Sequence, residues 1–292
     1  MWLQQITLPR ALLLLCTALG VFRYRRRLLR LCRSLVRWNW TSSGPDPPSG
    51  DPPSGDPPSR DSPSRDHPSG EQLLCRFVMN NSVHGQSKSI LESFDQWLQE
   101  PGHGQEGARV RRNHLGPEKG VFLDNVFARV APSVVLELGT YCGYSAVRML
   151  RLLPPEGKLY TVEKSEEVAN MAEEMILVAG FKNVQFQLLV LSSEDAIAKS
   201  KRSWGVESFD LVLMDHHPGQ YLEDLRALEN HRLLSAGTII LANDAEGPDA
   251  SDFLQDVQSD PHYWVRSRCQ GLLEIVCTKE RISSPAQTLK ED

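Results

Sequence analysis

The sequence predicts an α/β fold: a doubly wound sheet that closes with an antiparallel pair of strands. From residue 134 onwards, short apolar runs alternate with segments of helical periodicity, which is typical of parallel strands joined by right-handed helical crossovers. The first run, VVLEL at 134–138, ends in a glycine turn. Two final apolar stretches, 263–267 and 272–277, are expected to pair as an antiparallel end of the sheet.

The helices and strands are expected in the following order. Before the sheet, helical periodicity predicts three helices, over 72–81, 88–99 and 118–130. Within the sheet region, apolar runs predict five strands, at 134–138, 159–163, 184–189, 209–215 and 238–243. Helices are expected after each of these strands, at 144–153, 166–180, 193–201, 221–231 and 249–258. Such sheets bind ligands at the carboxyl ends of their strands, so the residues there are the candidates for a site.

Charge is distributed unevenly along the 292 residues. The whole chain carries −5 at pH 7, and its first 45 residues hold eight arginines and no acidic residue, so the remainder carries −13. An acidic body argues against nucleic acid as a partner, whereas the basic end favours membrane lipid with anionic headgroups. The six cysteines show no CxxC or other paired spacing, which favours reduced thiols and a cytosolic environment.

Residues 1–43 are expected to hold the protein on a membrane. Residues 11–22 are apolar throughout, although as a helix they rise only about 18 Å, less than the roughly 30 Å of a hydrocarbon core. Four arginines then share one face of a basic amphipathic helix, namely Arg26, Arg30, Arg33 and Arg37. A cleaved signal peptide is the alternative. The excess of arginine after the apolar stretch predicts a single-pass anchor whose C-terminal side is cytosolic, in either the endoplasmic reticulum or the plasma membrane.

Three further regions follow the anchor. Residues 44–70 repeat every five residues in proline, serine, glycine and aspartate, a composition that cannot build a core and predicts a disordered linker. Residues 71–279 carry the regular α/β pattern and form the working domain. Residues 280–292 are expected to be a tail.

The turn after the first strand indicates what kind of ligand the domain takes. Gly139 follows the strand directly and lets the backbone approach a ligand closely, and Gly143 comes four residues later. A dinucleotide fold would have GxGxxG here to cradle a pyrophosphate. This spacing therefore favours a ligand without a pyrophosphate, with an ordinary strand–helix turn as the alternative.

Polar residues at the next two strand ends suit a nucleoside. Glu163 ends the second strand, 24 residues after Gly139, where a carboxylate can accept hydrogen bonds from both ribose hydroxyls. Ser193 and Glu194 begin the helix after the third strand. They either contact an adenine edge or merely cap the helix.

The fourth and fifth strand ends suggest a cation site. Asp215 and His216 end the fourth strand, and Asn243 and Asp244 end the fifth. Neighbouring strand ends bring these oxygens together, and carboxylate and amide oxygens suit Mg²⁺. His217 follows His216 directly, and adjacent side chains point apart on an extended chain, so a zinc site is disfavoured. The structural alternative is that Asp215 caps the following helix and that Asn243 and Asp244 form an ordinary turn.

Four stretches of the sequence resemble the catechol O-methyltransferase family, which includes membrane-tethered members. They are VLELGTYCGYSAVRM, the strand ending in Glu163, FDLVLMDH and LLEIV. The similarity runs from about Leu73 to Thr278. It implies a class I methyltransferase, Rossmann-like, with S-adenosylmethionine and Mg²⁺. The donor residues it implies are Leu115, Glu137, Gly139, Tyr141, Ser145, Glu163, Ser193, Glu194, Asp215 and His216. It further implies Mg²⁺ at Asp215, Asn243 and Asp244, and a catechol-type substrate whose oxygens reach the metal and Glu274.

The sequence departs from this family at the catalytic base. Pro218 stands where the family has a lysine, and the family's Asp-Asn metal pair is inverted as Asn243-Asp244. His217, beside the vacant lysine position, is the candidate general base because histidine exchanges protons near neutral pH. The expected function is a membrane-anchored, Mg²⁺-dependent methyltransferase acting on a small catechol-type molecule. The alternative is an interaction protein of the same fold, with little or no catalysis, that acts on a membrane protein partner.

Overall fold

A computed structural model describes residues 68–101 and 103–279 of the chain. The predicted anchor at 1–43, nearly all of the predicted linker and the tail at 280–292 lie outside these residues. Within the described part, no helix is both long enough and apolar enough to cross a membrane. The described residues fall in one of the two units into which the chain divides, beginning at Arg65, and this unit carries the sheet.

The sheet has seven strands in the order β3-β2-β1-β4-β5-β7-β6. Their bounds are β1 Val134–Leu138, β2 Lys158–Glu163, β3 Phe186–Val190, β4 Leu211–Met214, β5 Ile239–Ala242, β6 Tyr263–Cys269 and β7 Leu272–Cys277. The first five pair in parallel, and β7 pairs antiparallel with both β5 and β6. The predicted doubly wound α/β sheet with an antiparallel C-terminal pair is confirmed, with β7 inserted between β5 and β6.

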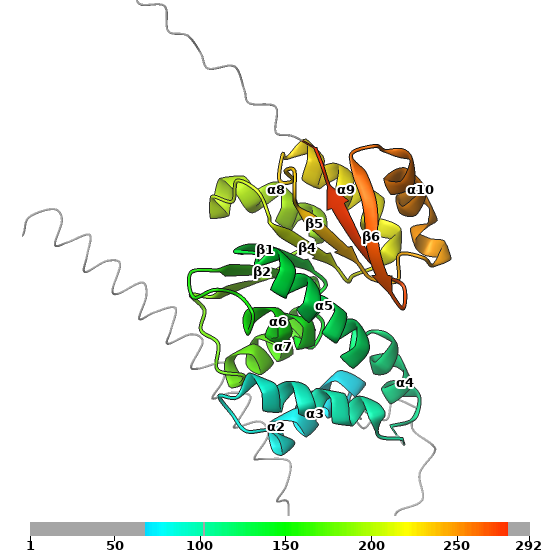
Figure 1. The fold of residues 1–292 in the computed structure, drawn as a ribbon. Helices are drawn as coiled ribbons and strands as arrows, with labels where there is room; N and C mark the ends of the chain where they lie inside the picture. The colour runs from blue at the N-terminus through cyan, green and yellow to red at the C-terminus, as the bar shows by residue number, and fades with distance from the viewer. Residues whose placement is uncertain (1–67, 102, 280–292) are drawn as a thin grey trace, which may run out of the picture. The chain divides into compact units, whose positions relative to one another are not determined.

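Helices cover both faces of the sheet (Figure 1). Their bounds are α2 Gly70–Asn81, α3 Ser87–Gln99, α4 Gly104–Arg112, α5 Gly116–Val130, α6 Tyr144–Leu150, α7 Glu166–Val178, α8 Ser193–Trp204, α9 Tyr221–Asn230 and α10 Ser251–Ser259. Two short 3₁₀ helices, η1 Pro218–Gln220 and η2 Pro248–Ala250, precede α9 and α10. In Figure 1, α2, α3 and α4 lie together beneath α5, α6 and α7, whereas α8, α9 and α10 lie across the sheet.

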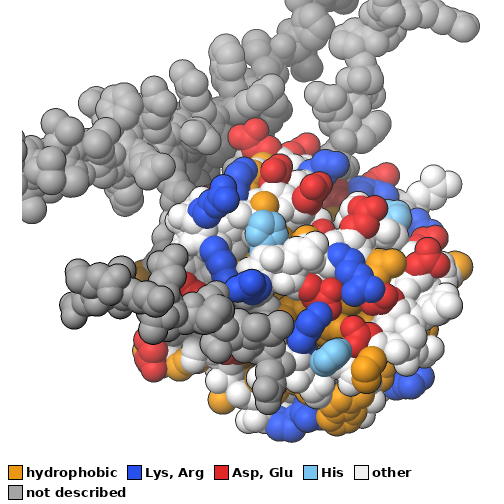
Figure 2. All heavy atoms as spheres, turned by 90° about the horizontal axis from the view of Figure 1, so that it is seen from above, with side chains coloured by type: hydrophobic (Ala, Val, Ile, Leu, Met, Phe, Trp, Pro, Cys, Tyr) orange, Lys and Arg blue, Asp and Glu red, His pale blue; other side chains and the backbone are white. Residues whose placement is uncertain are grey.

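Alternate residues of the central strands supply two separate cores. In β4, Leu211 and Leu213 are buried with the helices α2 to α7, and Val212 and Met214 are buried with α8, α9 and α10. Because successive side chains of a strand point to opposite faces, one apolar run can serve both layers. This explains why the central strands are continuously apolar. On the outside, the face in Figure 2 intersperses lysine and arginine with aspartate and glutamate side chains.

Most predicted elements are confirmed within a few residues, with three differences. The strand predicted at 184–189 begins only at Phe186, because residues before it form a turn in which Gln185 N–H donates to Lys182 O (2.8 Å) and Val184 is 73 % exposed. Helix α4 was not predicted, since GQEGARVRR offers a single large apolar residue, Val110, to its buried side. The antiparallel strand predicted to end at 267 continues to Cys269 past a bulge.

Candidate active site

The carboxyl ends of β1, β4 and β5 meet at one edge of the sheet. Asp215 N–H donates to Leu138 O (2.8 Å), and Asn243 N–H donates to Met214 O (2.9 Å), so the strand order continues for one residue past each strand. Gly139, Asp215 and Asn243 therefore lie side by side. These are the residues that the strand-end prediction selected.

The turn after β1 depends on its glycines. Gly139 has φ +98°, and a Cβ added there would lie 2.5 Å from Asp215 O, so a larger residue would collide with backbone. Gly143 has φ +88°, and between the two glycines Tyr141 also takes a positive φ, of 47°. The turn is thus held in a conformation that L-residues rarely adopt.

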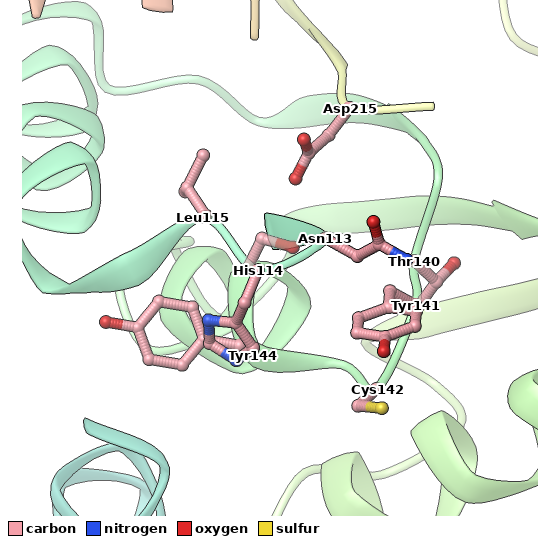
Figure 3. Close-up of a pocket in the computed structure, with 9 residues that line it drawn as sticks. Asn113, His114, Leu115, Thr140, Tyr141, Cys142, Tyr144 and Asp215 are labelled. Carbon is pink, nitrogen blue, oxygen red and sulfur yellow. The ribbon is translucent and has the colours of Figure 1, made fainter. Parts of the chain in front are cut away.

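This turn lines a pocket that also takes in residues 113–115 and the start of α6 (Figure 3). Figure 3 shows Leu115 and the Asp215 carboxylate pointing toward each other across it. The lining residues are Asn113, His114, Leu115, Thr140, Tyr141, Cys142, Tyr144, Ser145 and Asp215. Four predicted donor residues, namely Leu115, Tyr141, Ser145 and Asp215, therefore share one pocket.

Glu163 lies at the end of β2, next to the glycine turn. Its Oε2 accepts from Tyr141 N–H (3.1 Å) and its Oε1 accepts from Ser165 N–H (2.9 Å). The side chain is partly exposed, so its carboxylate is fixed by backbone donors and still open to solvent. A carboxylate held in this way can accept further hydrogen bonds from two neighbouring hydroxyls.

Glu137 is an internal member of the site. It is fully buried on β1, where it accepts hydrogen bonds from the Ser145 and Thr161 hydroxyls. Burial raises the pKa of Glu137 to about 8, partly offset by these hydrogen bonds. Glu137 and Ser145, both predicted to bind the donor, are thus brought together and bonded to each other beneath the turn.

Tyr141 is held by residues that sequence reasoning did not find. Its hydroxyl donates to Glu71 Oε1 (2.7 Å), and both Glu71 oxygens accept from Arg109 of α4 (2.6 Å each). Burial acts to raise the pKa of Glu71, but the hydrogen bonds from Arg109 and Tyr141 outweigh it and lower that pKa to about 2. No motif in the sequence links these residues, because they come from two helices and a turn.

His114 and Leu115 close the pocket from the segment before α5. His114 Nδ1 accepts from Gly116 N–H (3.3 Å), and its ring lies 4.4 Å from that of Tyr144. Its Nε2 is buried without a hydrogen-bond partner among the described residues. Burial lowers the pKa of His114 to about 3, so this imidazole is neutral.

His216 is oriented by a buried carboxylate. Its Nε2 lies 2.7 Å from Asp224 Oδ2, and Asp224 is 1 % exposed. Its Nδ1 is buried and has no hydrogen-bond partner in the described part of the chain. This nitrogen is enclosed and keeps its hydrogen-bonding capacity unused, and the donor contact predicted for His216 stays a prediction.

His217, the predicted base, is exposed and caps η1. Its Nδ1 accepts from Gly219 N–H (3.1 Å), a hydrogen bond that needs an unprotonated Nδ1. In the neutral ring the proton then lies on Nε2. His217 can take a proton from a substrate only where this cap is released.

Ser193 and Glu194 lie at the start of α8, after β3. The N-cap of this helix is Ser192, whose Oγ accepts from Asp195 N–H (3.1 Å). Ser193 is thus freed from capping. Glu194 is exposed at this helix start, and its predicted contact with the donor stays a prediction.

The three predicted metal ligands do lie together, but two of them already accept hydrogen bonds from the ammonium group of a lysine, Lys119. Asn243 Nδ2 donates to Asp215 Oδ1 (2.7 Å), while Lys119 Nζ donates to Asn243 Oδ1 (2.7 Å) and to Asp244 Oδ1 (2.8 Å). Burial raises the pKa of Asp215 to about 7, partly offset by Asn243 and Lys119. The Lys119 ammonium therefore lies among the oxygens assigned to Mg²⁺.

This arrangement does not fit a divalent ion. Among the described residues, no group of three histidine, cysteine, aspartate or glutamate side chains is arranged to hold one. Two of the three oxygen-bearing side chains bond Lys119, and Asn243 turns its nitrogen, a donor, toward Asp215. A metal would have to displace the ammonium and reorient the amide.

Glu274 is occupied by other partners. It is fully buried on β7, opposite Leu241, and its carboxylate is bonded by Arg129 and by Ser267 Oγ (2.5 Å), with Arg266 Nη1 3.5 Å away. These contacts leave its oxygens engaged inside the protein. The role of Glu274 toward a substrate oxygen stays a prediction that these contacts do not favour.

Comparisons with known proteins identify the family of this chain. A family model described as O-methyltransferase matches residues 102–245. Transmembrane O-methyltransferase of Homo sapiens is 38 % identical over 214 residues, covering 73 % of this chain and 70 % of that protein. Catechol O-methyltransferase of Mus musculus is 37 % identical over 193 residues, covering 66 % and 69 %. The chain belongs to the O-methyltransferase family.

Solved structures support the fold at lower identity. An S-adenosylhomocysteine-bound methyltransferase of Podospora anserina superposes with a TM-score of 0.54 at 17 % identity, covering 71 % of this chain and 94 % of that one. A Streptomyces achromogenes O-methyltransferase involved in tomaymycin synthesis, solved in complex with S-adenosylmethionine, superposes with a TM-score of 0.53 at 18 % identity, covering 67 % and 97 %. The class I methyltransferase fold expected from the sequence is confirmed, as is the resemblance to the catechol O-methyltransferase family.

Proposed function

We propose that this protein transfers a methyl group from S-adenosylmethionine to a hydroxyl oxygen of a small catechol-type molecule. The observation that carries the proposal is the meeting of the Gly139 turn, Glu163 and the oxygen cluster of Asp215, Asn243 and Asp244 at one edge of the sheet. A nucleoside site and a polar acceptor site are thereby adjacent. The catechol class is supported by the relatives named catechol O-methyltransferase.

The donor end of the site is assigned to residues whose polar atoms have unused hydrogen-bonding capacity. When bound, S-adenosylmethionine supplies an electrophilic methyl group on its sulfonium. Glu163 is held by two backbone N–H groups and is proposed to accept the ribose hydroxyls. His216 Nδ1, kept in place through Asp224, is proposed to meet the base of the nucleoside. Gly139 lets the backbone approach the ligand without a side chain between them.

Methyl transfer is an in-line displacement in which the acceptor C–O bond forms as the donor's C–S bond breaks. The hydroxyl proton must go to a base, and the products are a methyl ether and a neutral thioether. The protein contributes mainly by positioning the two reactants and by stabilising charge on the acceptor oxygen. Leu115, buried beside Asp215, helps to exclude water from this point.

His217 is proposed as the base, as its place beside Pro218 suggests. It must first release Gly219 N–H from its Nδ1, which then becomes the proton acceptor. His217→Ala is expected to lower kcat by on the order of 10²-fold with little change in donor affinity. An unchanged kcat would assign proton acceptance to another group or to water.

We also propose that the N-terminal segment anchors the protein in a membrane and that residues 71–279 lie in the cytosol. The apolar segment 11–22 and the arginines after it support an anchor. Relatives named transmembrane O-methyltransferase support membrane association. The Mg²⁺ requirement also stays a prediction, and the Lys119 contacts argue against it.

One residue favours the alternative of an interaction protein acting on a membrane protein partner. Pro218 stands where the resemblance implies a lysine base, and positioned bases contribute 10²–10⁴-fold to rate. Under this alternative the donor site persists while turnover is weak. Pro218→Lys would then restore methyl transfer to a parent that shows little.

The proposed function is tested by following labelled methyl groups from S-adenosylmethionine to catechol with the full chain. Phenol, which has one hydroxyl, is the matched acceptor control. Transfer to catechol well above transfer to phenol is expected. Donor binding without transfer to either acceptor, in the parent and in Pro218→Lys, would contradict the proposal.

A further inference from the structure

Lys119 connects the helix in front of the pocket to the oxygen cluster at the sheet edge. Its Nζ donates to Asn243 Oδ1 (2.7 Å) and Asp244 Oδ1 (2.8 Å). The Lys119 side chain is 13 % exposed, whereas that of Asp244 is 56 % exposed, so the ammonium lies on the inner side of the pair. A polar group this far from water needs hydrogen-bond partners, and these two oxygens supply them.

The turn between β6 and β7 contacts both the start of α5 and the loop after β5. Lys119 lies in the first turn of α5, and the preceding residue, Glu118, accepts a hydrogen bond from Gln270 Nε2 in the turn between β6 and β7. That turn also holds the loop after β5, since Ala245 N–H donates to Gly271 O (3.1 Å). The lysine and its two acceptors are therefore tied to the same turn.

The cluster also has the charge that a cation position requires. Asp244 supplies a carboxylate to Lys119, and the Asn243 amide joins Lys119 to Asp215 by accepting from the first and donating to the second. An ammonium carries three N–H donors. Lys119 uses two of its three N–H donors in these hydrogen bonds, and the third has no partner among the described residues.

We propose that the Lys119 ammonium is a built-in cation that occupies the place of a divalent metal in this site. A divalent ion and Lys119 compete for the oxygens of Asn243 and Asp244, and like charges at this separation repel strongly. The chain consequently binds divalent ions weakly. The free N–H of Lys119 is then directed to the acceptor oxygen, where it stabilises the negative charge that develops as the proton leaves.

This last role rests on the proposed methyl transfer, but the competition does not. The competition is therefore tested by metal binding rather than turnover. Mn²⁺ is titrated into the full chain, and free Mn²⁺ is followed by its electron paramagnetic resonance signal. The parent is compared with Lys119→Met, which keeps the length of the side chain and removes its charge. Lys199→Met, at an exposed position of α8, is the matched control.

Lys119→Met is expected to bind Mn²⁺ at least tenfold more tightly than the parent, and Lys199→Met is expected to match the parent. Asp244→Ala added to Lys119→Met should abolish the gain. Equal or weaker binding by Lys119→Met overturns the proposal. Far-UV circular dichroism identifies an unfolded variant, in which case Lys119→Gln replaces it.

The Mn²⁺ affinity of the unmodified chain is a second test of the proposal. Mn²⁺ binding by the unmodified chain with Kd below about 0.1 mM, lost in Asp244→Ala, overturns the proposal whatever the lysine variants do. Absence of methyl transfer would contradict the proposed function and leave the metal result standing. The two failures are thereby distinguished.

Discussion

Gly139 joins the fold and the proposed function in one residue. Its φ of +98° and its approach to the Asp215 backbone leave no room for a side chain. Gly139→Ala is expected to lower the free energy of unfolding by about 1–2 kcal/mol for the left-handed backbone and by a further 1–3 kcal/mol or so for the collision. It is also expected to abolish donor binding. Chemical denaturation measures the stability loss.

Gly205 supplies the control for that measurement. It ends α8 with φ +67°, and a Cβ added there would meet nothing within 4 Å. Gly205→Ala therefore carries the backbone cost without the collision. Equal losses in the two variants would show that the contact with Asp215 does not matter.

Single residues were predictable where the chain order of the strands brings them together. Gly139, Asp215 and Asn243 follow parallel neighbouring strands, so their adjacency follows from the alternation of strands and helices alone. Lys119 and Glu71 were missed because their positions depend on how helices before the sheet pack against it. A lysine in the first turn of a helix has no sequence signal that separates a buried partner from a solvated one.

At the scale of elements, α2 and α4 hold the turn that carries Tyr141. Arg109 and Tyr141 lower the pKa of Glu71 to about 2, from an ordinary value of 4.5. A depressed carboxyl pKa contributes stability that is present above the unfolded value and is lost as pH falls through the folded value. Glu71→Gln is therefore expected to reduce stability most above about pH 5, with the difference from the parent shrinking between about pH 4.5 and pH 2.

Thermal melting from pH 7 to pH 3 checks this dependence. Glu92→Gln is the control, since Glu92 is exposed and pairs with exposed Lys88 on α3. That variant should match the parent at every pH. A Glu71→Gln difference that stays constant with pH would mean that the Glu71 charge does not hold these helices.

The elements themselves were predicted to different degrees. The buried parallel strands have continuous apolar runs, and this pattern identified β1, β2, β4 and β5 within two or three residues. Helix α4 was missed because it is held by the Arg109–Glu71 ion pair and one buried valine rather than by an apolar face. Ion pairs between helices have no period in the sequence.

At the scale of the whole molecule, the apolar segment and the basic N-terminus predict that the domain is held on a membrane. Deleting residues 2–22 is expected to move the protein from the membrane to the soluble fraction of cells, because the apolar segment is lost. A chain in which Arg26, Arg30, Arg33 and Arg37 are all glutamate should bind membranes more weakly or in the opposite orientation. Asn39 begins the glycosylation sequon Asn39-Trp40-Thr41, and because glycosylation occurs in the lumen, its glycosylation would contradict a cytosolic domain.

The edge formed by β1 and β2 is proposed to bind the nucleoside of a methyl donor. The most direct measurement is calorimetry of S-adenosylmethionine binding to the full chain, its Glu163→Ala variant and a Glu166→Ala control in the exposed first turn of α7. The parent and the control are predicted to bind alike, and Glu163→Ala to bind more weakly by about 1.5–3 kcal/mol, because charged hydrogen bonds to the ribose are lost. Equal binding by all three, or none by the parent, would contradict the claim.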